Sequence, residues 1–205
     1  MLSRIFSTSY DEFISTLYKD IDLAVSELES NCQLMQDDSE DKLSGFIVSQ
    51  LKRAGHNASL GTTGGGNKDL TVLGKQPTWS WIGEAKKYGS LTNLHEAMLQ
   101  LVSRYKNVDA TKNCGGILAY IFRPNARKLM DDWQVSVHKT KTNLEGLKIT
   151  ACQQRKNLAF YTTHNHSSSG LPVTIRHIGI SLHFAPQDKS ARSAKKYKAK
   201  GTGAA

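Results

Sequence analysis

Apolar side chains in the first part of the chain recur at the spacing of a helix. They follow one another at intervals of three and four residues, which places them along one side of a helix. The members of this stripe are Phe13, Leu17, Ile21, Val25 and Leu28. The pattern predicts a helix over about residues 11–31, with an acidic opposite face.

A second helical pattern begins after a polar break at residues 36–39, whose side chains can cap a helix. Its apolar stripe runs from Leu43 to Leu51, and Gly55 is a typical residue to end it. Glu40 lies three residues before Leu43, on the same side of the helix. We therefore expect the Glu40 carboxylate on the buried face.

Beyond Gly55 the pattern changes to short runs rich in β-branched and aromatic residues, which are typical of strands. A continuous apolar run at residues 116–122 indicates a strand that is covered on both faces. The expected strands are 57–62, 68–73, 78–86, 116–122, 158–162 and 173–184, and the expected helices are 93–106 and about 129–137. Together these elements predict a mixed α/β fold in which helices flank a central mixed sheet.

The composition is that of one globular core. The chain has 205 residues, of which 39% are hydrophobic, and a chain of this size can bury about 70% of its unfolded surface. The longest uncharged apolar run, residues 114–122, is far shorter than the roughly 20 residues of a transmembrane helix. No apolar stretch of signal-peptide length precedes Asp11. We therefore expect a cytoplasmic protein with no membrane contact, and we expect its three widely spaced cysteines to stay reduced.

The net charge of +9 is unevenly distributed. Residues 1–42 carry three Lys or Arg against ten Asp or Glu, whereas residues 43–188 carry eighteen against eight. The last seventeen residues add six basic side chains and no acid. A basic body suits a polyanionic partner, because neutralising phosphates releases counterions. A basic surface that only maintains solubility is the alternative.

Candidate catalytic residues lie at the ends of two strands that are expected to be neighbours. Asp69 is near the start of one strand and Glu84 is near the end of the other, so pairing of the strands would bring the two carboxylates together. Lys86 shares a face with Glu84 because side chains alternate along a strand. Two carboxylates and an ammonium suit Mg²⁺ binding and attack of water on phosphorus. The structural alternative for Glu84 and Lys86 is an exposed cross-strand charge pair.

The order of these features resembles the PD-(D/E)XK nuclease superfamily, which has the restriction-endonuclease-like fold. The resemblance covers about residues 38–122. The matching features are a helix with Glu40, a glycine-rich loop at 62–67, Asp69, the sequence Glu84-Ala85-Lys86, a helix with Gln100, and the strand 116–122. They look like the nuclease domains of bacterial anti-phage and restriction proteins. The family often has Tyr four residues after the Gln, where this chain has Arg104 followed by Tyr105.

The resemblance implies a Mg²⁺-dependent deoxyribonuclease, with Mn²⁺ able to substitute. The implied metal ligands are Asp69, Glu84, the carbonyl of Ala85, and Glu40 directly or through water. The implied catalytic residues are Glu40, Asp69, Glu84, Lys86 and Gln100. Lys86 would position the attacking water, and Gln100 would position either the substrate or Lys86.

The expected partner is nucleic acid, most of all double-stranded DNA, in restriction or phage defence. Candidate phosphate contacts are Lys52, Arg53, Lys87, Arg123, Arg127 and Lys128. The chain is expected to comprise an acidic helical segment over 1–37, a nuclease-like core over 38–188 and a disordered basic tail over 189–205. A homodimer or a larger defence complex is consistent with the acidic helix as a docking element. The alternative is a non-catalytic nucleic-acid-binding or assembly subunit that retains the nuclease fold.

Overall fold

The computed structural model describes residues 7–61, 70–104, 109, 111–139 and 144–186. Its helices are α1 (Tyr10–Ser30), a 3₁₀ turn (Cys32–Leu34), α2 (Glu40–Arg53), α3 (Leu91–Arg104) and α4 (Ala126–Lys139). Its strands are β1 (Asn57–Leu60), β2 (Leu70–Leu73), β3 (Ser80–Lys87), β4 (Cys114–Ile121), β5 (Lys148–Ala151), β6 (Ala159–Asn165) and β7 (Pro172–Ser181). The expected glycine-rich loop at 62–67 and the expected disordered tail at 189–205 lie outside the described residues.

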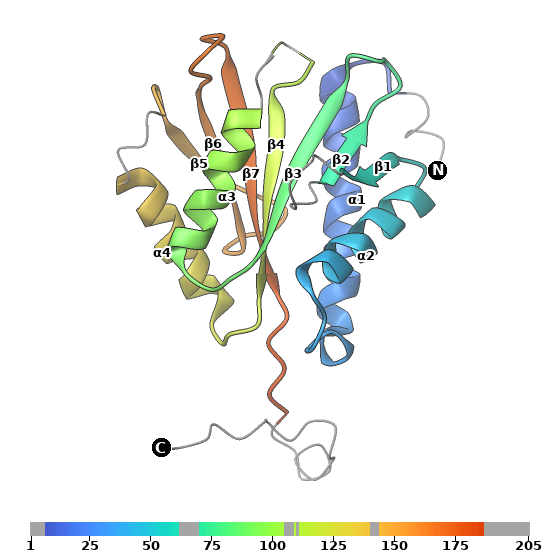
Figure 1. Cartoon of the computed structure of the whole chain (residues 1–205), viewed down its shortest axis with the longest axis vertical. Helices are drawn as coiled ribbons and strands as arrows, with labels where there is room; N and C mark the ends of the chain where they lie inside the picture. The colour runs from blue at the N-terminus through green and yellow to red at the C-terminus, as the bar shows by residue number, and fades with distance from the viewer. Residues whose placement is uncertain (1–6, 62–69, 105–108, 110, 140–143, 187–205) are drawn as a thin grey trace.

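The strands form one seven-stranded mixed sheet with the order β1-β2-β3-β4-β7-β6-β5. The three central strands β3, β4 and β7 are parallel, and the pairs toward both edges are antiparallel. Figure 1 shows α1 and α2 on one face of the sheet and α3 and α4 on the other. The mixed α/β class expected from the hydrophobic pattern is therefore confirmed.

The expected pairing of the second and third strands is confirmed. Leu70 of β2 lies opposite Gly83 of β3, and the pair is antiparallel. The edge strand β5 was not predicted, because its four residues are exposed or half-buried and show no clear alternation of apolar and polar side chains. An edge strand packs too little apolar surface to leave a strong pattern in the sequence.

Side-chain caps fix the starts of the two N-terminal helices. Ser9 accepts a hydrogen bond from the backbone N–H of Glu12 at the start of α1. Ser39 does the same for Lys42 at the start of α2. Gly55 follows α2 with a φ of +94°, a left-handed conformation that glycine adopts without the steric cost of a Cβ.

The aromatic ring of Trp81 lies in the core between the sheet and the N-terminal helices. Two glycines make room for it: a Cβ at Gly83 would lie 2.4 Å from the ring, and a Cβ at Gly116 would lie 2.5 Å from it. Trp79 belongs to the same core cluster. Both tryptophans are therefore buried in the core.

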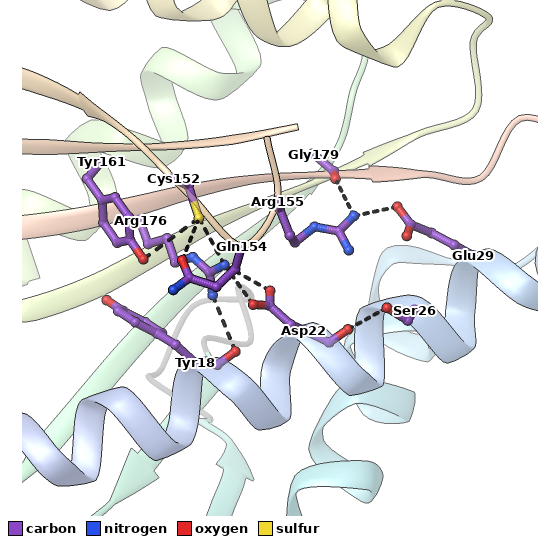
Figure 2. Close-up of polar contacts among 10 residues, drawn as sticks. All are labelled: Tyr18, Asp22, Ser26, Glu29, Cys152, Gln154, Arg155, Tyr161, Arg176 and Gly179. Atoms are coloured by element: carbon purple, nitrogen blue, oxygen red, sulfur yellow. Dashed lines mark hydrogen bonds and ion pairs between the residues drawn. The ribbon is translucent and has the colours of Figure 1, made fainter. Parts of the chain in front are cut away.

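Two arginines of the C-terminal half bind acidic residues of α1. The Nη2 of Arg176 on β7 donates to both carboxylate oxygens of Asp22, each at 2.9 Å, and its guanidinium lies over the ring of Tyr18, 5.0 Å from its centroid. Arg155 donates to Glu29 at 2.7 Å. Figure 2 shows these contacts along one side of α1. They join the first helix to the C-terminal strands.

A neutral histidine lies in the core beside these strands. Trp133 Nε1 donates to Nδ1 of His177 at 3.1 Å, so in the neutral ring Nε2 carries the proton and donates to Thr162 Oγ1 at 2.9 Å. Burial lowers the pKa of His177 to about 3, with a further contribution from His164. The ring is therefore uncharged at neutral pH.

No helix in the described part of the chain is both long enough and apolar enough to cross a membrane.

Candidate active site at the carboxyl end of strand β3

Two carboxylates converge on the ammonium of Lys86. Its Nζ lies 2.8 Å from Glu84 Oε1 and 3.7 Å from Glu40 Oε1. Glu84 is 2% exposed, and the Lys86 side chain is 17% exposed. The exposed cross-strand pair considered from the sequence is therefore wrong, because Glu84 is buried.

The strand geometry of β3 explains why Glu84 and Lys86 meet. Side chains two residues apart lie on one face of a strand, so both point toward the same side of the sheet. Ala85, between them, points to the opposite side and belongs to the core cluster beneath α1 and α2. The next strand, β4, pairs Ile117 with Glu84 and Ala119 with Lys86. This parallel pairing holds the segment in the centre of the sheet.

Glu40 reaches the cluster from the other side of the sheet, at the first residue of α2. Its Oε2 accepts a hydrogen bond from the backbone N–H of Lys87 at 2.7 Å. Its side chain is 36% exposed, so the expectation that it lies on the buried face of the helix is wrong. The reason is that Glu40 is the first residue of α2. At this end of the helix its side chain contacts the end of strand β3 and does not reach the hydrophobic core.

The turn before α2 is also attached to β3. Lys87 Nζ donates to the backbone carbonyl of Asp38 at 2.9 Å, and the Asp38 carboxylate accepts from Lys42 at 2.6 Å. With the bond to Glu40, two separate hydrogen bonds from Lys87 hold the start of α2 against the end of β3. The position of the Glu40 carboxylate is therefore fixed by backbone as well as side-chain contacts.

Tyr120 and Ser44 lie beside Glu40 and were not identified from the sequence. The Tyr120 hydroxyl is 3.0 Å from Ser44 Oγ, and both side chains are buried. Burial raises the pKa of Tyr120, the hydrogen bond with Ser44 opposes this rise, and the negative charge of Glu40 adds to it. The phenol is therefore neutral at physiological pH. The only sequence signal was the position of Tyr120 within an apolar strand.

Two other predicted site residues, Asp69 and Gln100, stay predictions. Asp69 lies outside the described residues; Leu70, which follows it in the sequence, is paired with Gly83, which precedes Glu84. Gln100 lies on α3, half-buried, with its Oε1 buried. Arg104 is the last residue of α3, and Tyr105 lies outside the described residues.

The donors in the cluster are of the type that Mg²⁺ prefers, namely carboxylate oxygens. Glu84 and Glu40 supply them on either side of Lys86. Among the residues with a described position, no group of three or more His, Cys, Asp or Glu is placed to hold a metal ion. The two carboxylates thus fit the ion in chemical type.

The candidate phosphate contacts divide into two groups. Lys52 and Arg53 lie in the last turn of α2, about 20 Å along the helix from Glu40 at 1.5 Å per residue. The expectation that these two lie near the site is therefore wrong. Lys87 and Arg123 lie at the ends of β3 and β4, while Arg127 and Lys128 lie in the first turn of α4.

Comparison of the chain with protein-family models, with curated proteins and with solved structures finds no match. Its function must therefore be inferred from its own residues.

Proposed function

We propose that the protein is a Mg²⁺-dependent nuclease that hydrolyses phosphodiester bonds in DNA, most of all in duplex DNA. The observation that carries this proposal is the convergence of buried Glu84 and half-buried Glu40 on Lys86 at the carboxyl end of a central parallel strand. Open α/β sheets characteristically bind ligands outside the carboxyl ends of their strands. The resemblance to PD-(D/E)XK nucleases supports the same assignment.

The buried carboxylate of Glu84 needs a compensating partner, because its desolvation is costly. Removing a carboxylate from water costs several kcal/mol unless a partner compensates. Lys86 provides that partner for Glu84. The second carboxylate, Glu40, also contacts the Lys86 ammonium, at 3.7 Å. The arrangement brings one cation and two anions together, of which Glu40 is the most exposed at 36%.

In the proposed reaction, Lys86 orients the water that attacks phosphorus by donating a hydrogen bond to its oxygen. Glu40 holds the Lys86 ammonium in place, and Glu84 provides a carboxylate for the ion together with Asp69. Bound Mg²⁺, for which Mn²⁺ can substitute, would supply positive charge to offset the charge that develops on the phosphate. Gln100 is proposed to position the substrate or Lys86.

The charge distribution supports a nucleic-acid substrate. Residues 43–188 have a net positive charge, which favours association with a polyanion. A role in phage defence or restriction, as a homodimer or as part of a larger complex in the cytoplasm, belongs to this proposal through the resemblance alone.

The test is cleavage of supercoiled plasmid and linear duplex DNA by the purified chain with Mg²⁺ or Mn²⁺. Glu84→Gln and Lys86→Met should each abolish cutting, and a chelator should abolish it in the wild type. Glu96→Gln is the matched control, because Glu96 is an exposed carboxylate on α3 and its loss should leave the rate unchanged. Nicked or linearised plasmid would indicate an endonuclease, and shortened linear DNA an exonuclease.

Two results would refute the proposal. One is a wild-type protein that binds DNA but never cuts it with either metal. The other is cutting by Glu84→Gln at the wild-type rate. The first result would favour the alternative, a non-catalytic nucleic-acid-binding or assembly subunit. That alternative has one observation in its favour: Lys86 and Glu84 already neutralise each other at 2.8 Å, as a structural ion pair would.

A further inference from the structure

Two basic side chains at the carboxyl ends of β3 and β4 lie over aromatic rings. Lys87 Nζ is 4.5 Å from the ring centroid of Phe122. The Arg123 guanidinium carbon is 5.8 Å from the ring centroid of Tyr88. Each pair joins one strand end to the other, and in each the cation is exposed while the ring is half-buried. Below, these two pairs are called the rim. Lys87 and Tyr88 directly follow Lys86 in the sequence, and Phe122 and Arg123 directly follow β4.

Backbone pairing explains why the two pairs lie side by side. The N–H of Tyr88 donates to the carbonyl of Tyr120 at 2.9 Å, so the parallel pairing of β3 and β4 continues past the end of β3. The ring of Phe122 packs against the core beneath α1 and α2, and the ring of Tyr88 packs against the core beneath α3 and α4. The rim therefore has one cation on each face of the sheet.

These two cations differ from their neighbours in what compensates their charge. Lys42 is paired with Asp38, and on α4 Arg127 is paired with Asp131 and Lys128 with Asp132. Over the described residues, neither Lys87 nor Arg123 has a carboxylate within ion-pair distance. A carboxylate cancels the charge of a cation, whereas an aromatic ring only orients it. Lys87 and Arg123 therefore keep a full positive charge that can act on an external anion.

The rim also lies beside the candidate active site on both faces. Glu84, Lys86 and Tyr88 are two residues apart along the chain and so point to one face. On the other face, the backbone N–H of Lys87 binds Glu40. An extended anion that crosses the ends of the central strands would meet Arg123 on one side of this cluster and Lys87 on the other.

We propose that Lys87 and Arg123 bind backbone phosphates of duplex DNA on either side of the bond to be cut. This inference rests on the proposed function and assigns its substrate contacts. A phosphate is the group that fits, because both cations are exposed donors and each already lies over its ring. Such contacts position the backbone without reading its sequence.

The experiment measures binding of the full-length chain to a fluorescein-labelled duplex of about 20 base pairs by anisotropy, with Ca²⁺ in place of Mg²⁺ to prevent turnover. Lys87→Gln and Arg123→Gln should each raise Kd roughly tenfold, the loss expected for one charged hydrogen bond. Each should also reduce the slope of log K against log salt by about 0.9. Lys87→Arg should retain most of the affinity.

Lys75→Gln is the matched control. It removes the same charge from an exposed side chain in the turn between β2 and β3, at the opposite end of β3 from Lys87, so its Kd and salt slope should change little. Thermal unfolding of each variant checks that the fold is retained, which matters for Lys87 because it also bonds the Asp38 carbonyl. Equal effects of Lys75→Gln and Arg123→Gln would overturn the inference, as would wild-type protein that does not bind.

The outcomes separate this inference from the proposed function. DNA binding that depends on Lys87 and Arg123, with no cutting by the wild type, would support the phosphate contacts and refute the nuclease. Cutting that depends on Glu84, with wild-type Kd and salt slope in Lys87→Gln and Arg123→Gln, would support the nuclease and overturn the phosphate contacts.

Discussion

Replacing Asp22 with asparagine would remove the countercharge of a fully buried arginine. The Arg176 side chain is 0% exposed, and both of its short ionic contacts, at 2.9 Å, are to Asp22. The remaining partners of its guanidinium are the carbonyl of Tyr18 at 3.3 Å and the Cys152 sulfur at 3.3 Å. Neither carries the formal negative charge that the carboxylate supplies.

The expected loss of stability follows from the burial of the pair. Leaving a buried charge without its partner costs about 3–5 kcal/mol. Asp22 is 19% exposed, and asparagine can still accept one hydrogen bond, so we expect Asp22→Asn to lie near the lower limit, about 3 kcal/mol. For a domain of this size, that corresponds to a decrease in Tm of about 6–12 °C.

The assay is urea unfolding followed by tryptophan fluorescence, with thermal unfolding as a second measurement. Asp132→Asn is the control, because it breaks the exposed pair with Lys128 and should cost less than about 1 kcal/mol. The double variant Asp22→Leu with Arg176→Met should recover most of the loss, since an apolar pair needs no compensation. A loss in Asp22→Asn no greater than that in Asp132→Asn would refute the reasoning.

Two further predictions concern the core. Burial lowers the pKa of His177 to about 3 and that of His164 to about 4, so the unfolded chain, with histidine pKa values near 6.5, binds more protons at mildly acidic pH. The free energy of unfolding should therefore be highest above pH 6.5 and fall as the pH decreases toward 5. His177→Asn should reduce this slope in urea titrations at several pH values, and an unchanged slope would show that His177 does not contribute. Gly116→Ala places a Cβ 2.5 Å from the Trp81 ring and should cost about 1–3 kcal/mol by overpacking. A Gly116→Ala variant with wild-type stability would contradict this expectation, because the Trp81 ring would then have room to move away from the added Cβ.

Local patterns in the sequence were enough to predict most of the elements and part of the candidate site. Helices α1 and α2 follow from apolar residues at intervals of three and four, because helix geometry places such residues on one side. The common face of Glu84 and Lys86 follows from alternation along a strand. The elements that were not predicted are the 3₁₀ turn Cys32–Leu34 and β5, whose mostly exposed residues leave no pattern.

Tertiary structure alone decided which distant residues meet. Glu40 accepts a hydrogen bond from the backbone N–H of Lys87, which is 47 residues away in the sequence. Arg176 binds Asp22, which is 154 residues away. A local sequence pattern cannot show that residues so far apart in the chain are in contact. These contacts depend on how α1 and α2 pack against the completed sheet. Which residues share a face could be predicted from the sequence, because that depends on backbone geometry within a few residues. The packed chain decided which charges are compensated by carboxylates and which, like Lys87 and Arg123, lie over aromatic rings.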